Sequence, residues 1–151
     1  MARALVVLSA WLLASALPAP AQVTTTEYRH GAVTFLQGES EITLVLRSGS
    51  TYEADTSSHW TGVALWYSPQ GKPGVAPAFF LHLRKQEGPV FISALDVTGT
   101  PGNAYYDAAE SQCVLTLVRM DAQGVEGAGS CDGPFEGGGL PVRSFRFTAS
   151  R

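Results

Sequence analysis

Alternation of apolar and polar side chains, with a period of two residues, runs through most of the chain after residue 30. Glu41–Arg47 is the clearest case, with three aliphatic residues on one side and charged or β-branched residues on the other. Ala32–Gln37 and Ala78–Lys85 alternate in the same way. Because successive side chains of a strand point to opposite faces, this period predicts half-buried β-strands.

The remaining strand candidates are separated by short polar, Gly-rich or Pro-rich segments. Ser48–Ser50 predicts a turn after the strand Glu41–Arg47, and Ser68–Pro77 predicts a loop. No stretch after residue 22 has the apolar stripe of a helix. The other candidates are Val23–His30, Thr51–Asp55, His59–Tyr67, Val90–Val97, Ala104–Glu110 and Pro141–Thr148. We therefore predict an all-β fold, an antiparallel β-sandwich or barrel of about 8–10 short strands.

Gln112–Cys131 has the pattern of a β-hairpin closed by a disulfide. The turn is expected at Asp121–Gly124, where the Asp side chain can accept backbone hydrogen bonds and Gly124 supplies the positive φ that follows a type I turn. Cys113 and Cys131 are the only two cysteines, and their midpoint falls in this turn. Folding the hairpin brings them opposite each other, so we expect a disulfide; two buried free thiols are the alternative.

Residues 1–21 have the layout of a secretory signal peptide. Arg3 is followed by the apolar run Ala4–Leu17, and Ala19–Ala21 forms an A-x-A cleavage site that leaves Gln22 as the new N-terminus. Cleavage after Ala16 is an alternative. The apolar run is shorter than the roughly 20 residues that span a bilayer. We predict a signal peptide over 1–21 and a single β-sandwich domain over 22–151. The domain is expected to be secreted or periplasmic, with no transmembrane segment after cleavage.

The charge balance limits the classes of partner. The chain carries 10 Lys and Arg against 13 Asp and Glu, and the predicted signal peptide removes only Arg3 from these. An acidic surface repels phosphate groups, so we expect no nucleic acid and no anionic membrane as a partner. A chain of 151 residues forms one domain and can bury a core without needing a disulfide.

The C-terminal part of the chain is similar to the end of small secreted or surface β-sandwich proteins of bacteria, whose function is uncharacterised. Those proteins combine a cysteine strand, a turn with Asp and Gly, a Val-Glu-Gly strand that ends near a second cysteine, and a final Phe-containing strand. This chain departs from them at Ala128–Ser130, where an aromatic residue is usual. The matching residues are Cys113, Asp121, Gly124, Val125, Glu126, Gly127, Cys131, Ser144 and Phe145. The resemblance implies a β-sandwich and export, and it implies no activity.

Residues that could carry catalysis or bind a metal are scattered. His30, His59 and His82 lie on separate predicted elements, and the close His or Cys pairs of zinc sites do not occur. No Gly-x-Ser-x-Gly elbow occurs, and bridged cysteines cannot be nucleophiles. We therefore predict no catalytic residues, no metal and no cofactor.

Two further features have competing interpretations. Gly137–Gly139 is reminiscent of a phosphate-binding loop, but no helix pattern follows it, so we interpret it as a flexible linker. Asp96 lies in the apolar run Val90–Val97. It either faces inward, which requires hydrogen bonds or a raised pKa, or caps a turn at the strand end, which we favour.

Aromatic residues give the only basis for a binding site. Trp60 and Trp66 fall on one side of the strand His59–Tyr67, with small residues between them. They either form an exposed platform for a flat apolar ligand, a sugar or a protein, or fill the core, and we favour the core. In the first case, Trp60, Trp66, Phe79 and Phe80 line a ligand-binding pocket.

Three functions remain open at this point. We expect a non-catalytic exported β-domain that acts as an envelope or extracellular interaction or structural module, with a protein or a small ligand as partner. A small-ligand or carbohydrate-binding protein with the aromatic-lined pocket is the alternative. A small hydrolase without a recognisable motif is the third, and the fold class alone does not choose among them.

Overall fold

The computed structural model describes residues 23–54, 60–99, 102–107, 112–132 and 135–151, so the predicted signal peptide lies outside the described residues. Ten strands form one antiparallel sheet, and this part of the chain contains no helix that could cross a membrane. The strands are β1 Val23–Tyr28, β2 Ala32–Gln37, β3 Ser40–Ala54, β4 Trp60–Ser68, β5 Ala78–Lys85, β6 Phe91–Thr98, β7 Ala104–Asp107, β8 Gln112–Met120, β9 Gly124–Asp132 and β10 Val142–Ser150. The predicted all-β antiparallel fold is confirmed.

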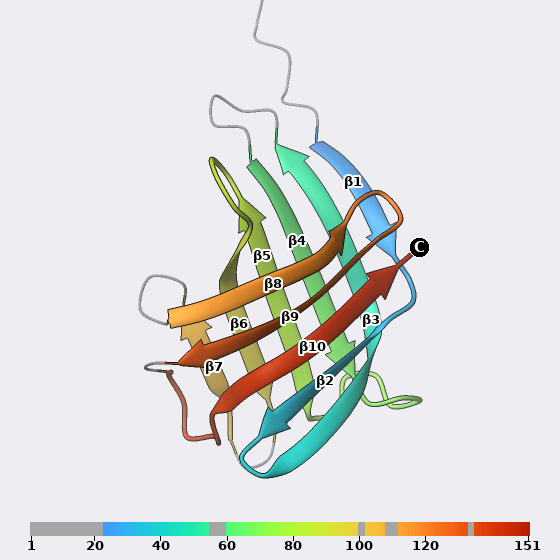
Figure 1. Cartoon of the computed structure of the whole chain (residues 1–151). Coiled ribbons are helices and arrows are strands. Elements are labelled where there is room, and N and C mark those ends of the chain that lie inside the picture. The colour runs from blue at the N-terminus through green and yellow to red at the C-terminus, as the bar shows by residue number, and fades with distance from the viewer. Residues whose placement is uncertain (1–22, 55–59, 100–101, 108–111, 133–134) are drawn as a thin grey trace, which may run out of the picture.

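The sheet curls over on itself into a half-barrel. Its strand order is β7-β6-β5-β4-β3-β2-β10-β9-β8, and β1 pairs with β3. In Figure 1, β2, β10, β9 and β8 (the front half) cross over β1 and β3–β7 (the back half). The curl also brings β8 into contact with β6. The inner faces of the two halves therefore cover each other.

The core lies between the two halves and is centred on aromatic residues. Phe79 of β5 lies 5.0 Å from Phe35 and 5.4 Å from Phe145, between ring centroids, so it joins the back half to the front half. The buried Tyr67 donates its hydroxyl to the carbonyl oxygen of Thr148 at 3.0 Å. Each large side chain removed from water in this way contributes about 1.5–3 kcal/mol to folding.

The long strand β3 replaces two strands that the sequence predicted. The expected turn at Ser48–Ser50 does not form, and this prediction is wrong. Instead, the pairing with β4 shifts register between Leu46 and Ser48, which bends the strand without ending it. A larger residue would be tightly packed at position 49, because a Cβ there would lie 3.0 Å from Leu65 Cδ2 and 3.1 Å from Tyr28 Cβ. The first part of β3 pairs with β2 and the last part with β1.

The β8–β9 hairpin forms as predicted, and the disulfide joins Cys113 to Cys131, which are register partners. In the turn, Asp121 Oδ1 accepts hydrogen bonds from the backbone N–H groups of Gln123 and Gly124, at 2.8 and 3.0 Å. The positive φ expected at Gly124 is wrong. Glycine is needed there for space, because a Cβ would lie 2.5 Å from the carbonyl oxygen of Ala149.

The segment around Gly137–Gly139 is held in place and is not the flexible linker that the sequence suggested. Glu136 forms a two-way backbone bridge with Tyr105 of β7, at 2.8 Å in each direction. Gly139 donates its N–H to the carbonyl oxygen of Asn103 at 3.0 Å. Gly137 has φ +112°, and a Cβ at this position would lie 2.0 Å from the same oxygen, so a larger residue would clash. The glycines allow this segment to pack against the start of β7.

Candidate functional site

The outer face of the back half carries the exposed aromatic side chains of the described chain. On β4 the odd positions Val63, Leu65 and Tyr67 are fully buried, so the even positions point outward. Trp66 is 38% exposed, and the prediction that it fills the core is wrong. We call this surface the outer aromatic face; it comprises Tyr52, Trp66, Phe80, His82, Phe91 and Tyr105.

The structure brings together two of the four aromatic residues that the sequence suggested for a pocket. Trp66 and Phe80 are direct cross-strand partners on β4 and β5, and each is 38% exposed. Phe79 is fully buried and points the other way, into the core. The side chain of Trp60 lies outside the described residues. Phe79 therefore cannot share an outer surface with Trp66 and Phe80.

Polar groups continue the row that Trp66 and Phe80 begin. Phe80 is the register partner of Asp96 on β6, and Asp96 is the partner of Tyr105 on β7. Direct partners have Cβ atoms about 4.5–5.5 Å apart, so four side chains form one line across four strands. Asp96 thus takes neither expected position, since it faces outward within the strand. Its partial burial raises the pKa of this carboxyl above the ordinary value.

His82 occupies the centre of the outer aromatic face and is held at both ring nitrogens. The ring of Tyr52 lies over Gly62, where a Cβ would come within 2.6 Å of two ring carbons, and its hydroxyl bonds to His82 Nε2. Ser93 Oγ lies 2.8 Å from His82 Nδ1. Ser93 is the extra residue where the β5–β6 register shifts, and such bulges redirect a side chain.

These two contacts satisfy both ring nitrogens of a neutral imidazole, one as donor and one as acceptor. Ser93 donates its hydroxyl to the carbonyl oxygen of His82 at 3.1 Å, which leaves Ser93 Oγ to accept from Nδ1–H. Nε2 then accepts from the Tyr52 hydroxyl. Partial burial, and secondly the positive charge of Arg84, lower the pKa of His82. The network therefore favours an uncharged ring stacked beside Phe80, with ring centroids 6.4 Å apart.

A hydroxyl and an imidazole in contact also suggest nucleophilic catalysis, because a base next to a serine can activate it. Such a base must accept a proton, and the charged imidazole that results needs a stabilising neighbour, usually a carboxylate. Here the second partner of His82 is the phenol of Tyr52, and Arg84 opposes a positive charge. The described residues contain no group of three or more His, Cys, Asp or Glu that could hold a metal ion. The side-chain partners of His82 given by the structure are therefore two hydroxyl groups, those of Tyr52 and Ser93.

The sequence did not reveal the Tyr52–His82–Ser93 cluster. It placed His82 among scattered polar residues, and the three side chains come from β3, β5 and β6. Strand register alone brings them together. Within the sequence, the signals available were the alternation that places His82 beside Phe80 on the outer side of β5 and the glycine at position 62.

We expect thermal stability to fall as the pH decreases through about 6.5, the ordinary pKa of histidine. Because folding lowers the pKa of His82, the unfolded chain takes up a proton there before the folded chain does, and this uptake favours unfolding. His82→Gln should weaken this pH dependence. The measurement is the melting temperature across this pH range. If the melting temperature changes equally with pH in the wild type and in His82→Gln, the expectation is contradicted.

Comparison of the chain with protein-family models, curated proteins and solved structures gives no match. The environment and function of the protein are therefore argued from its own sequence and structure. The Cys113–Cys131 disulfide is consistent with an oxidising, extracytoplasmic location.

Proposed function

We propose that the protein is an exported binding domain that holds a carbohydrate chain on its outer aromatic face. The observation that carries this proposal is the adjacent pair Trp66 and Phe80, two large rings left 38% exposed on an otherwise well-packed domain. Contact of large aromatic side chains with water is unfavourable, so a bound partner that covers them gains free energy. The signal-like segment 1–21 and the disulfide support a secreted or periplasmic location.

The chemistry of the row favours a sugar as the ligand. A pyranose ring has an apolar C–H face and a rim of hydroxyl groups. Trp66 and Phe80 offer flat apolar surface for the C–H face, while Asp96 and Tyr105 continue the line with one acceptor and one hydroxyl. The uncharged His82 ring lies at the centre of the surface, and the charged side chains of Asp96 and Arg84 lie on the same face.

The expected result of Trp66→Ala is at least tenfold weaker binding to polysaccharide, because truncating a central aromatic contact costs about 2 kcal/mol or more. Phe80→Ala should act in the same direction. Binding is measured by retention on insoluble cellulose and chitin and by affinity electrophoresis in gels that contain soluble β-glucan.

The matched control is Val118→Ala, which removes an exposed apolar side chain from the front half, where Val118 is 72% exposed. This variant should bind as the wild type does. Retention that is absent for every polysaccharide, or equal for wild type and Trp66→Ala, would overturn the proposal. Turnover of p-nitrophenyl acetate that is lost in Ser93→Ala would instead identify the protein as a hydrolase.

A further inference from the structure

The inner face of the back half changes from apolar to polar at one end of the half-barrel. Val63 and Leu83 are register partners on this face and both are fully buried. The next inward-facing position, towards the start of β4, is Thr61, whose partners are Glu53 on β3 and Lys85 on β5. Because direct partners in an antiparallel pair share a face, these three side chains all point towards the inside of the curl.

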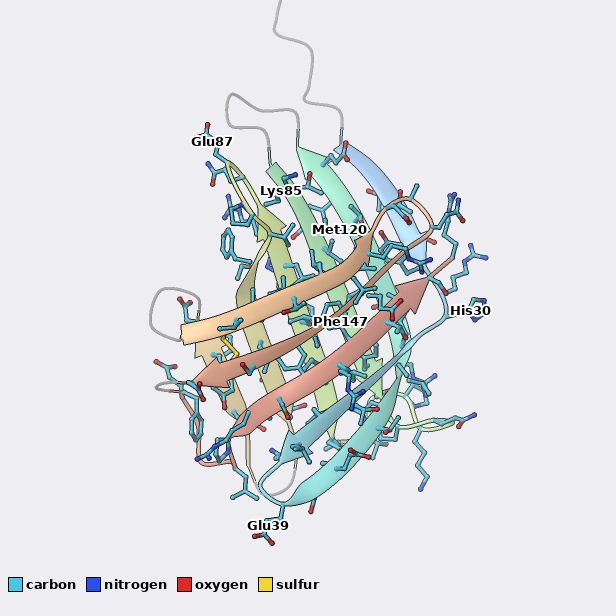
Figure 2. The ribbon with its side chains drawn as sticks, in the orientation of Figure 1. His30, Glu39, Lys85, Glu87, Met120 and Phe147 are labelled. Atoms are coloured by element: carbon cyan, nitrogen blue, oxygen red, sulfur yellow. A yellow bond between two sulfur atoms is a disulfide. The ribbon has the colours of Figure 1, made fainter. Side chains whose placement is uncertain are left out.

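A cleft of about 370 Å³ lies over this polar row. The β8–β9 turn covers it from the front half with Met120, Asp121 and Ala122. Met120 and Lys85 lie at the same end of the molecule, opposite to Glu39 (Figure 2). The volume falls within the range of small-ligand sites. We call this site the mouth cleft; its other lining residues are Thr26, Tyr28, Thr51, Glu53, Thr61, Lys85 and Val90.

The floor of the mouth cleft is already ordered. The Tyr28 hydroxyl lies 2.6 Å from Thr51 Oγ1 and donates to the carbonyl oxygen of Asp121 at 3.3 Å. This contact connects β1 and β3 of the back half to the turn of the front half, so it sets the width of the cleft. A ligand would therefore meet a pre-formed site and would not have to order it.

Glu53 and Lys85 face the mouth cleft with opposite charges and do not neutralise each other. A third charged residue of the lining, Asp121, has its carboxylate bonded to backbone N–H groups of its own turn. Within the described residues, Glu53 and Lys85 form no ion pair. They lie on strands separated by β4, which places their backbones about 10 Å apart at the usual strand spacing. The hydroxyl of Thr61 lies between them, and Val90 and Met120 supply apolar surface. This arrangement is complementary to a small molecule with a cationic group at one end and an anionic group at the other.

We propose that the mouth cleft binds a short peptide with both termini free. The peptide ammonium group pairs with Glu53, its carboxylate pairs with Lys85, and an aliphatic side chain packs against Met120. A neutral polyol would use the hydroxyl groups but would leave both charges uncompensated. This site is on the inner side of the back half and is independent of the outer aromatic face.

The test uses the dipeptide Ala-Leu and isothermal titration calorimetry on the mature protein. Free Ala-Leu should bind and should also raise the melting temperature, as any ligand selective for the folded state does. N-acetylated Ala-Leu and Ala-Leu amide should each bind at least tenfold more weakly, since each has lost one charge-assisted contact.

The variants assign each terminus to its partner. Glu53→Gln should weaken binding of free Ala-Leu at least tenfold and should bind the N-acetylated form no worse than the wild type does. Lys85→Met should also weaken binding of free Ala-Leu at least tenfold, and it should bind Ala-Leu amide no worse than the wild type does. Lys72→Met, in the exposed loop before β5, is the matched control and should bind as the wild type does.

Absence of measurable heat with Ala-Leu, equal binding of the free and blocked peptides, or wild-type binding by both charge variants would overturn the proposal. Trp66→Ala separates the two proposals, because it should weaken polysaccharide retention and leave dipeptide binding unchanged. Loss of dipeptide binding in Trp66→Ala would place the peptide on the outer aromatic face instead.

Discussion

Replacing Phe79 with alanine is expected to lower the free energy of unfolding by about 3–5 kcal/mol, whereas the same change at Phe80 should cost less than about 1 kcal/mol. The two residues are neighbours in the sequence and have the same side chain. Phe79 is fully buried between Phe35 and Phe145, so its removal leaves a cavity between the two halves of the half-barrel. Phe80 is on the outer aromatic face, where water fills the space.

Urea unfolding followed by intrinsic fluorescence or far-ultraviolet circular dichroism measures both values. The pair acts as its own control, because composition and hydrophobicity change equally in the two variants. Similar losses for Phe79→Ala and Phe80→Ala would contradict the assignment of the inner and outer faces of β5. A larger loss for Phe80→Ala would reverse it.

Removing the disulfide should lower the free energy of unfolding by about 3 kcal/mol, as expected in the chain-entropy model for a loop of this size. Cys113 and Cys131 are 18 residues apart and face each other across the β8–β9 pair. Cys131 belongs to the core, but aromatic and aliphatic residues make up the rest of it, so the double variant Cys113→Ala/Cys131→Ala should still fold at room temperature. The measurement is the melting temperature of the two proteins by circular dichroism.

A reducing agent should lower the melting temperature of the wild type and leave that of the double variant unchanged. This comparison separates loss of the bridge from any effect of the two alanine side chains. Equal melting temperatures for the oxidised wild type and the double variant would contradict a stabilising role for the bridge.

Alternation was sufficient to predict the strands, because most of them have one face on the core. Ala32–Gln37 and Ala78–Lys85 have the same bounds in the sequence prediction and in the structure. The turn predicted from residue types at Ser48–Ser50 was wrong, because these residues pair with β4 within a continuous strand and Gly49 lies close to Tyr28 and Leu65. Alternation failed at Trp66. Both faces of β4 are apolar, and the small residues between Trp60 and Trp66 suggested that these rings fill the core.

The candidate sites depended on information that one strand does not carry. Trp66 and Phe80 were both named from the sequence, but their adjacency follows from the register of β4 against β5. The mouth cleft went unnoticed because Glu53 and Lys85 have the pattern of ordinary surface charges. Only the pairing of β3, β4 and β5 brings them onto one row with Thr61.

The length of β3 has a consequence for how the protein folds and unfolds. This 15-residue strand exchanges backbone hydrogen bonds with β2 in the front half and with β1 and β4 in the back half. Neither half retains a complete set of strand pairs if β3 is lost. The domain therefore behaves as one cooperative unit, and it cannot be divided into two independently stable lobes.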